Sequence, residues 1–220
     1  MMDTPAEHHV SALAQWIPSA SYRRGRWKNG AGWTREIHVE PGAVAGADSA
    51  RVTDGPAVAA DDWLWRLSIA EIEQDAPFST FPGVDRELVL LQGHGLRLRF
   101  DDGVEHQLEP PFQRLRFAGE RAVTGVLTDG RTEDFNLMWE RRGVGAQFLH
   151  RPLVGAMVVF VEPGQTWVVH LLAGQARMPG PDAIDIGAGD TVLLRAGAQR
   201  QRHALDGGGE ALLIRIDPLP

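Results

Sequence analysis

The sequence contains no cysteine. This absence excludes disulfide bonds, thiolate zinc sites and cysteine nucleophiles together, and it is compatible with a reducing cytosol without requiring one. Long apolar runs are also missing, since no stretch approaches the roughly 18 apolar residues of a membrane-spanning helix. The first ten residues, MMDTPAEHHV, lack the basic start and apolar centre of a secretory signal. We therefore expect a cytoplasmic protein with no membrane partner.

An excess of positive charge is absent as well, because the formal net charge of the 220 residues is −7. A general nucleic-acid-binding protein would normally present a basic face, so we expect no nucleic-acid partner. Hydrophobic residues make up 43% of the chain and charged residues 23%, which is typical of a folded globular protein.

The apolar segments are short, and the 25 glycines and 14 prolines separate them. Many short strands with turn residues every 8 to 12 positions or so are typical of a β-sandwich or β-barrel. The predicted strands are Ile37–Val39, Trp63–Ile69, Leu88–Leu91, Leu96–Phe100, Val123–Leu127, Phe135–Trp139, Ala156–Val161, Thr166–Leu172, Asp190–Leu194 and Ala211–Ile216. Very little helix is expected, the best candidate being a short piece over Ser11–Trp16. Gly207–Gly209 is interpreted as a turn.

Two features divide the chain. Gly42–Asp62 is rich in Ala and Gly without periodicity and predicts a long flexible loop. A seam near Arg141–Pro152 separates a longer first half from a shorter second one, in which Ile186–Leu194 resembles the turn-and-strand pattern of a cupin barrel. We predict an all-β, cupin-like double barrel (a bicupin), folded as one compact unit over 1–220 with halves at 16–145 and 150–220.

The segment Trp27–Ile37 gathers polar residues around a glycine-rich bend. Lys28, Asn29, Arg35 and Glu36 surround glycines that would let a ligand approach the backbone closely. One interpretation is a ligand-facing rim, and the other is a solvated β-turn that leads into a strand.

Alternation along Trp63–Ile72 places Arg66 and Ser68 on one face. If that face is solvent, Arg66 is a surface charge. If the face is enclosed, Arg66 needs an anionic partner, because an unpaired buried charge is costly. A ligand carboxylate, Glu36 or Asp85 could each fill that role.

Two further segments carry candidate ligand-binding residues. In Ala76–Gly93, Phe78 and Ser79 precede a Pro-Gly turn, and Asp85 and Arg86 open an apolar strand. Asp85 and Arg86 form either an internal ion pair at a barrel mouth or a ligand site in which Asp85 accepts a hydrogen bond or acts as a base.

The segment Glu133–Arg142 alternates so that Asp134, Asn136 and Met138 share a face. Asn136 can both donate and accept, which suits either a pocket wall or an ordinary sheet position.

Metal and nucleophilic chemistry find little support. The eight histidines are scattered, with His8 and His9 near the N-terminus, and none lies in an H-x-H arrangement with a nearby glutamate. A metal site needs several convergent ligands, so we expect no metal and no cofactor. The chain also lacks a G-x-S-x-G elbow, a dinucleotide-binding glycine motif and a phosphate-binding loop.

Taken in order, these segments resemble the HutD/Ves family. The matching residues are Trp27-Lys28-Asn29-Gly30, Thr34-Arg35-Glu36-Ile37, Trp65-Arg66 with Ser68, Phe78-Ser79, Phe81-Pro82-Gly83, Asp85-Arg86, Asp134-Phe135-Asn136, Met138 and Arg141-Arg142. The resemblance is clear over about 16–142 and weaker beyond. Two features depart from the family pattern, namely Ala31, where a third consecutive glycine is common, and the expanded loop at 42–62.

The resemblance implies a two-barrel cupin of bacterial histidine utilisation that binds a small acidic intermediate such as urocanate or formylglutamate, with no firmly attached enzymatic activity. It also implies that Arg35, Arg66 and Arg86 share one pocket, with Asn29 and Asn136 as neutral partners. Three hypotheses stay open: a non-catalytic binding protein, a hydrolase or isomerase with Asp85 or Glu36 as base, and a structural cupin. Exposed edge strands are compatible with a homodimer.

Overall fold

The computed structural model describes residues 10–11, 13–42, 63–180 and 183–220. Most of the predicted loop at Gly42–Asp62 lies outside the described residues, as do His8 and His9. The chain divides into two compact units, one formed by 1–21 with 145–218, the other by 22–144 with 219–220. Each is described below by itself.

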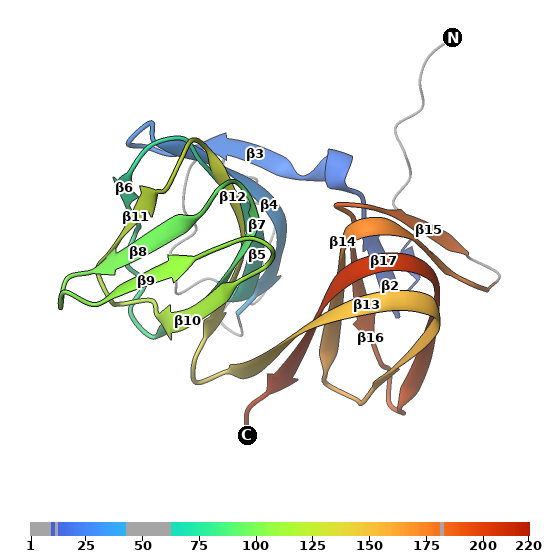
Figure 1. Ribbon diagram of the computed structural model, residues 1–220. Helices are drawn as coiled ribbons and strands as arrows, with labels where there is room; N and C mark the ends of the chain where they lie inside the picture. Colours follow the sequence, from blue (N-terminus) through green and yellow to red (C-terminus); the bar gives the residue numbers. More distant parts are fainter. Residues whose placement is uncertain (1–9, 12, 43–62, 181–182) are drawn as a thin grey trace, which may run out of the picture. The chain divides into compact units, whose positions relative to one another are not determined.

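The unit formed by 22–144 holds a six-stranded and a four-stranded antiparallel sheet (Figure 1). The larger sheet has the order β10 (Arg114–Ala118), β7 (Val84–Gln92), β12 (Thr132–Glu140), β5 (Trp63–Ile72), β4 (Gly32–Pro41) and β3 (Arg23–Arg26). The smaller sheet has the order β6 (Ala76–Pro77), β11 (Val123–Leu127), β8 (Leu96–Phe100) and β9 (Glu105–Leu108).

One apolar cluster joins these two sheets and identifies the enclosed face of the larger one. From the larger sheet come Ala70, Leu88 and Leu90, and from the smaller one come Leu98 and Phe100, all of them buried. Because side chains alternate between the faces of a strand, every second residue of β5, β7 and β12 points toward this interior. We call this the inner face, and the opposite side of the same sheet the outer face.

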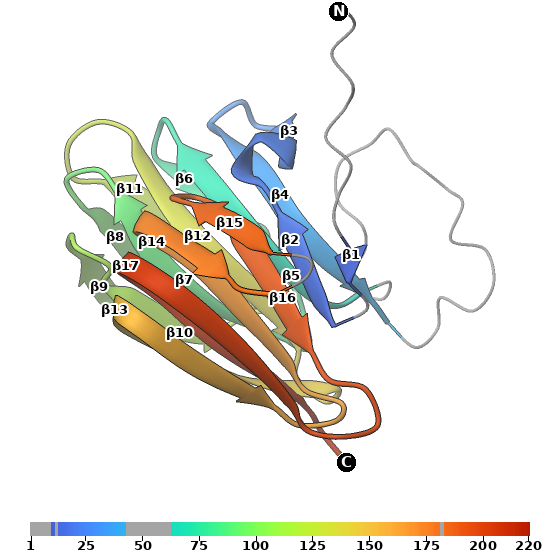
Figure 2. The same cartoon turned by 90° about the vertical axis from the view of Figure 1, so that its right-hand side faces the viewer.

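The second unit is built on a seven-stranded sheet, whose main order is seen side by side in Figure 2. That order is β1 (Val10–Ser11), β2 (Ala14–Ile17), β16 (Thr191–Arg195), β14 (Thr166–Met178), β17 (Gln201–Pro218) and β13 (Val144–Val161), with β15 (Ile184–Gly187) also paired to β14. Its core is a separate cluster that includes Val161, Leu171 and Leu194.

The start of the chain belongs to this second unit. β2 pairs with β16, and Asp190 accepts hydrogen bonds from the Ser19 amide at 2.8 Å and the Trp16 indole at 3.2 Å. The short helix predicted over Ser11–Trp16 is therefore wrong, and the predicted halves at 16–145 and 150–220 differ from the observed units at this end. A long-range strand partner outweighs the weak local helix preference.

The glycine run Gly207–Gly209 is not a turn, as the sequence suggested, but lies within β17 opposite Gly174 and Ala176 of β14. Backbones approach so closely here that a Cβ on Gly209 would lie 1.9 Å from the Ala173 carbonyl oxygen. Glycine is needed for this contact and for the φ of +143° at Gly209.

The all-β prediction is confirmed, with one 3-10 turn at Ser19–Ser21 as the only helical element in the described ranges. All ten predicted strands are present, and the short strands β1, β2, β3, β6, β9, β10 and β15 were not predicted. Among the residues with described positions there is no helix long and apolar enough to cross a membrane.

Candidate ligand-binding site

A belt of polar side chains crosses the inner face of the six-stranded sheet. It consists of Glu36, Arg66, Ser68, Arg86, Asp134 and Asn136. Cross-strand register places Met138 opposite both Arg66 and Arg86, and Asn136 opposite both Ser68 and Leu88. Glu36 continues the second row, since it pairs with Ser68. On one side of the belt lies the apolar cluster shared with the smaller sheet, and on the other lie Trp63, Val84 and Val39. The belt is thus a polar strip inside an otherwise apolar interior.

Arg86 is the most buried cation of this belt, with only 6% of its surface exposed. Its Nη2 donates to Oδ1 of Asn136 at 3.2 Å, and its Nη1 donates weakly to the Ser79 carbonyl at 3.4 Å. The buried Nε has no hydrogen-bond acceptor. Burial lowers the pKa of Arg86 to about 10, although Asp134 favours the charged form. In the described part of the chain this guanidinium forms no ion pair with a carboxylate.

Aromatic rings form part of the remaining surroundings of Arg86. The guanidinium carbon lies 5.3 Å from the ring centre of Phe117, 5.4 Å from Phe78 and 5.9 Å from Phe81. A cation–π contact stabilises a desolvated cation by about 2 kcal/mol, whereas burial of an ion costs several kcal/mol and these contacts supply no opposite charge. The charge of Arg86 is therefore incompletely compensated.

Arg66 lies across β12 from Arg86 and is also poorly satisfied. Its Nε lies 3.3 Å from Oε2 of Glu36, but the approach is not aligned as a hydrogen bond, and this N–H has no acceptor. Glu36 also pairs with Arg23, so a single carboxylate serves two cations. Burial lowers the pKa of Arg66, and the neighbouring Glu36 opposes that shift.

Asp134 completes the belt at the other side of Asn136. It is fully buried, and its Oδ1 accepts a hydrogen bond from the Asn136 amide at 2.8 Å. Its Oδ2 is buried without a partner. Burial raises the pKa of Asp134 to about 7, with Arg86 and the Asn136 hydrogen bond opposing the shift.

Two predicted residues lie on the outer face instead. Arg35 pairs in register with Ile69, where its Nε lies 3.0 Å from Glu71 and its Nη2 donates to Glu133. Asp85 accepts hydrogen bonds from Arg116 at 2.7 Å and from Arg141 at 2.9 Å. The expected convergence of three arginines is thus reduced to two, since Arg35 already has its own carboxylates.

The other predicted residues lie at the ends of the strands or near the belt. Lys28 and Asn29 are exposed in the turn between β3 and β4, where Asn29 Oδ1 accepts the Ala31 amide at 3.1 Å. Phe78 is half-buried against Arg86, and Ser79 is exposed and contributes its carbonyl to that arginine. Ser68, Asn136 and Met138 are buried within the belt. A ligand-binding role for these residues stays a prediction.

The sequence did not identify Asp134, Phe81 or Phe117 as site residues. Asp134 could have been identified, because strand alternation placed it on the same face as Asn136. Phe117 carried no local signal: its place beside Arg86 depends on the pairing of β10 with β7.

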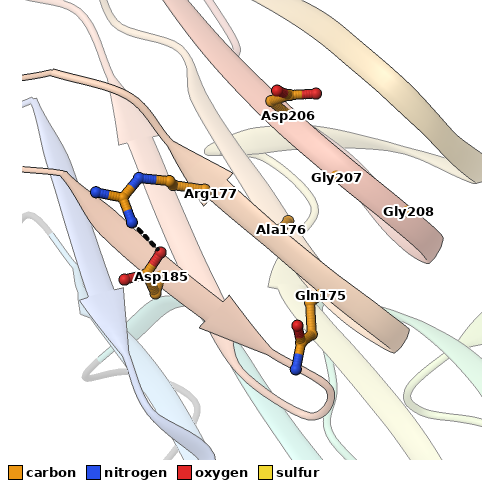
Figure 3. Close-up of a pocket in the computed structure, with 7 residues that line it drawn as sticks. All are labelled: Gln175, Ala176, Arg177, Asp185, Asp206, Gly207 and Gly208. Atoms are coloured by element: carbon orange, nitrogen blue, oxygen red, sulfur yellow. Dashed lines mark hydrogen bonds and ion pairs between the residues drawn. The ribbon is translucent and has the colours of Figure 1, made fainter.

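A surface groove of about 520 Å³ lies in the other unit, and Figure 3 shows its lining. It runs over the glycine-rich part of β17 and the neighbouring β14 and β15, with Arg177 bound to Asp185 at 2.7 Å. Both side chains are more than half exposed, so water screens their charges. The groove contains none of the predicted site residues.

No set of three or more His, Asp or Glu side chains within the described ranges is grouped to hold a metal ion.

The antiparallel sheets of the two units place the protein in a cupin-like fold class. Similar folds include a bacterial pirin, YhhW from Escherichia coli, with a TM-score of 0.62 at 9% identity over 94% of this chain and 100% of that one. The family model named HutD matches residues 19–213, and the chain therefore belongs to the HutD family.

Two solved structures are similar over nearly their whole length. HutD from Pseudomonas fluorescens SBW25 is 26% identical with a TM-score of 0.73, covering 94% of this chain and all of that one. A conserved protein of unknown function from Pseudomonas aeruginosa PAO1 is 25% identical with a TM-score of 0.75, covering 94% and 99%.

Two curated relatives match over shorter segments. An uncharacterised 21.2 kDa protein from the hutC 3′ region of Pseudomonas putida is 39% identical over 125 residues, which is 57% of each chain. Protein Ves from Escherichia fergusonii is 36% identical over 113 residues, which is 51% of this chain and 50% of that one. The matches thus span about half the length of these relatives.

Proposed function

We propose that this protein binds a small acidic metabolite of the urocanate or formylglutamate class without turning it over, and thereby modulates histidine utilisation. The ligand carboxylate would lie at Arg66 and Arg86. The observation that carries the proposal is the incomplete pairing of Arg86, a buried guanidinium whose protein hydrogen bonds go to an amide and a carbonyl. A carboxylate would supply charge-assisted hydrogen bonds that these neutral acceptors cannot match.

The charge distribution on the two faces supports this location. On the outer face Arg35 binds both Glu71 and Glu133, although these glutamates also pair with Arg24 and Arg131. On the inner face Arg66 shares Glu36 with Arg23, and Arg86 forms no ion pair with a carboxylate of the described residues. An anion placed on the inner face would relieve the repulsion by which Arg66 lowers the pKa of Arg86. The location of the Pseudomonas putida relative in the hutC 3′ region supports the link to histidine utilisation.

Thermal unfolding with added acids tests the proposal. At 100 times its dissociation constant a ligand stabilises a protein by about 2.7 kcal/mol, which raises the melting temperature by roughly 5–10 °C for a chain of this length. Urocanate and N-formylglutamate should each be titrated with the wild type and with Arg66→Gln. We expect the shift to be lost in this variant and kept in Arg35→Gln. No shift with either acid in the wild type would contradict the proposal.

Asp134 favours one alternative, a metal-independent hydrolase or isomerase acting on a related small carboxylic acid. A buried carboxyl group whose pKa is raised to about 7 can give or accept a proton near neutral pH. Glu36 also lies on the inner face, whereas Asp85 lies on the outer face beside Arg116 and Arg141. Turnover of a pathway acid by the purified protein, abolished in Asp134→Asn, would favour this alternative.

A further inference from the structure

Two buried atoms of opposite hydrogen-bonding character lack partners on the same inner face. One is the Nε–H donor of Arg86, and the other is the Oδ2 acceptor of Asp134. The residues themselves are 6% and 0% exposed, so water at the surface does not satisfy these atoms. A buried polar atom without a partner is costly, and two of them on residues that bind one side chain are a feature to be explained.

Asn136 connects the two residues that carry these atoms. Its Oδ1 accepts from Arg86 and its Nδ2 donates to Asp134 Oδ1, so the amide orientation is determined by both neighbours. Both unpartnered atoms therefore belong to residues that bind the same side chain. A small molecule that satisfies both atoms needs an acceptor for Arg86 and a donor for Asp134.

We infer that the ligand is an acid that also carries an N–H group, with the carboxylate at Arg66 and Arg86 and the N–H donating to Asp134 Oδ2. This inference rests on the proposed function and makes Asp134 the residue that determines ligand specificity. A plain dicarboxylate fits less well, because its second carboxylate would meet the oxygen of Asp134 rather than a donor.

The protonation of Asp134 supports this assignment. Burial raises its pKa to about 7, while Arg86 and Asn136 favour the ionised form. An N–H donor from a ligand adds a third group that favours the ionised form, whereas a second carboxylate would oppose it. A ligand with an N–H therefore lowers the cost of burying the ionised Asp134, whereas a dicarboxylate raises that cost.

A pair of matched acids tests the inference by isothermal titration calorimetry on the full chain at pH 7.5. Urocanate and 3-(2-furyl)acrylate share the planar five-membered ring and the acrylate, but the furan has an oxygen acceptor where the imidazole has an N–H. We expect urocanate to bind at least about 10-fold more tightly, since the furan cannot donate a charge-assisted hydrogen bond to Asp134. In Asp134→Asn, whose amide can donate at the former Oδ2 position, we expect this preference to disappear or reverse.

The outcomes separate the two proposals. Equal binding of both acids by the wild type, with no change of their ratio in Asp134→Asn, would overturn the role of Asp134 and leave the acid-binding function standing. Binding of neither acid would overturn both. Arg35→Gln on the outer face is the matched control, and we expect it to keep the wild-type ratio. If Asp134→Asn does not fold, the wild-type ratio of the two affinities still decides the inference.

Discussion

Arg66 of β5 and Arg86 of β7 both lie opposite Met138 of β12, so one strand separates two cations on the same enclosed face. Glu36 pairs with Arg66 but also with Arg23, and Asp134 reaches Arg86 only through Asn136. The low dielectric of a protein interior strengthens both the repulsion between like charges and their attraction for an anion. This arrangement is the basis of the proposed ligand capture.

Replacing Arg86 by Met should remove ligand binding without unfolding the protein. The unpaired charge costs desolvation energy, and the thioether can pack against Phe78, Phe81 and Phe117. At pH 6 we expect the free energy of unfolding to change by no more than about 1 kcal/mol, and the shift with urocanate to vanish. Urea denaturation with and without the acid measures both. A loss above about 3 kcal/mol would mean that Arg86 is a structural residue, as in a structural cupin.

Replacing Arg35 by Met should have the opposite effects: the protein should lose stability and keep its ligand binding. Arg35→Met leaves Glu71 and Glu133, whose side chains are 6% and 10% exposed, with one fewer cation. Arg24 and Arg131 still pair with these glutamates, so we expect a loss of about 1–3 kcal/mol rather than the full cost of a broken buried pair. The urocanate-induced stabilisation, measured in the same urea titrations, should be retained; its loss would place Arg35 in the binding site.

Asp134 should make stability fall as the pH rises from about 4 to 7. Its pKa is about 7 in the folded protein against 3.8 in the unfolded chain, so in this window the folded state holds a proton that the unfolded state has released. Stability falls with pH wherever the folded state binds more protons. The stabilisation that Asp134 contributes is fully present below its unfolded pKa of 3.8 and is lost as the pH rises through about 7. It amounts to about 4 kcal/mol at most.

Asp134→Asn should remove this slope in urea denaturation series from pH 4.5 to 8. Glu120, whose pKa the Arg141 hydrogen bonds lower to about 2, acts below this window and in the opposite direction. Parallel pH profiles for the wild type and the variant would show that Asp134 is not the group responsible.

Gly209→Ala should destabilise the second unit by more than about 3 kcal/mol. The new Cβ would lie 1.9 Å from the Ala173 carbonyl oxygen in the β14–β17 ladder, and the φ of +143° disfavours any side chain. Gly155→Ala is the matched control, because its φ of +71° is also positive but no atom lies within 4 Å of the added Cβ. We expect it to cost about 1 kcal/mol. Equal melting temperatures for the two variants would contradict the close approach.

Much of the local structure follows from the sequence because its causes are local. Turn residues and short apolar runs predicted the positions of ten strands, although β13 and β17 begin ten or more residues before their predicted starts. A period of two placed Arg66 with Ser68 and Asn136 with Met138. The strands that were missed are short or rich in charge. β3, for example, has the sequence RRGR, and only its pairing with β4 makes it a strand.

The sequence by itself determined the all-β class, the family resemblance and the residues that share a face within each strand. The tertiary structure decided which face packs against the smaller sheet, and hence that Arg66 and Arg86 lie on that inner face while Arg35 and Asp85 bind carboxylates and arginines on the other. The physical reason is that alternation defines two faces without saying which one meets the smaller sheet, and a shift of one residue in register exchanges them. That choice depends on cross-strand pairing and on the apolar surface that covers each face, and both are properties of the folded chain.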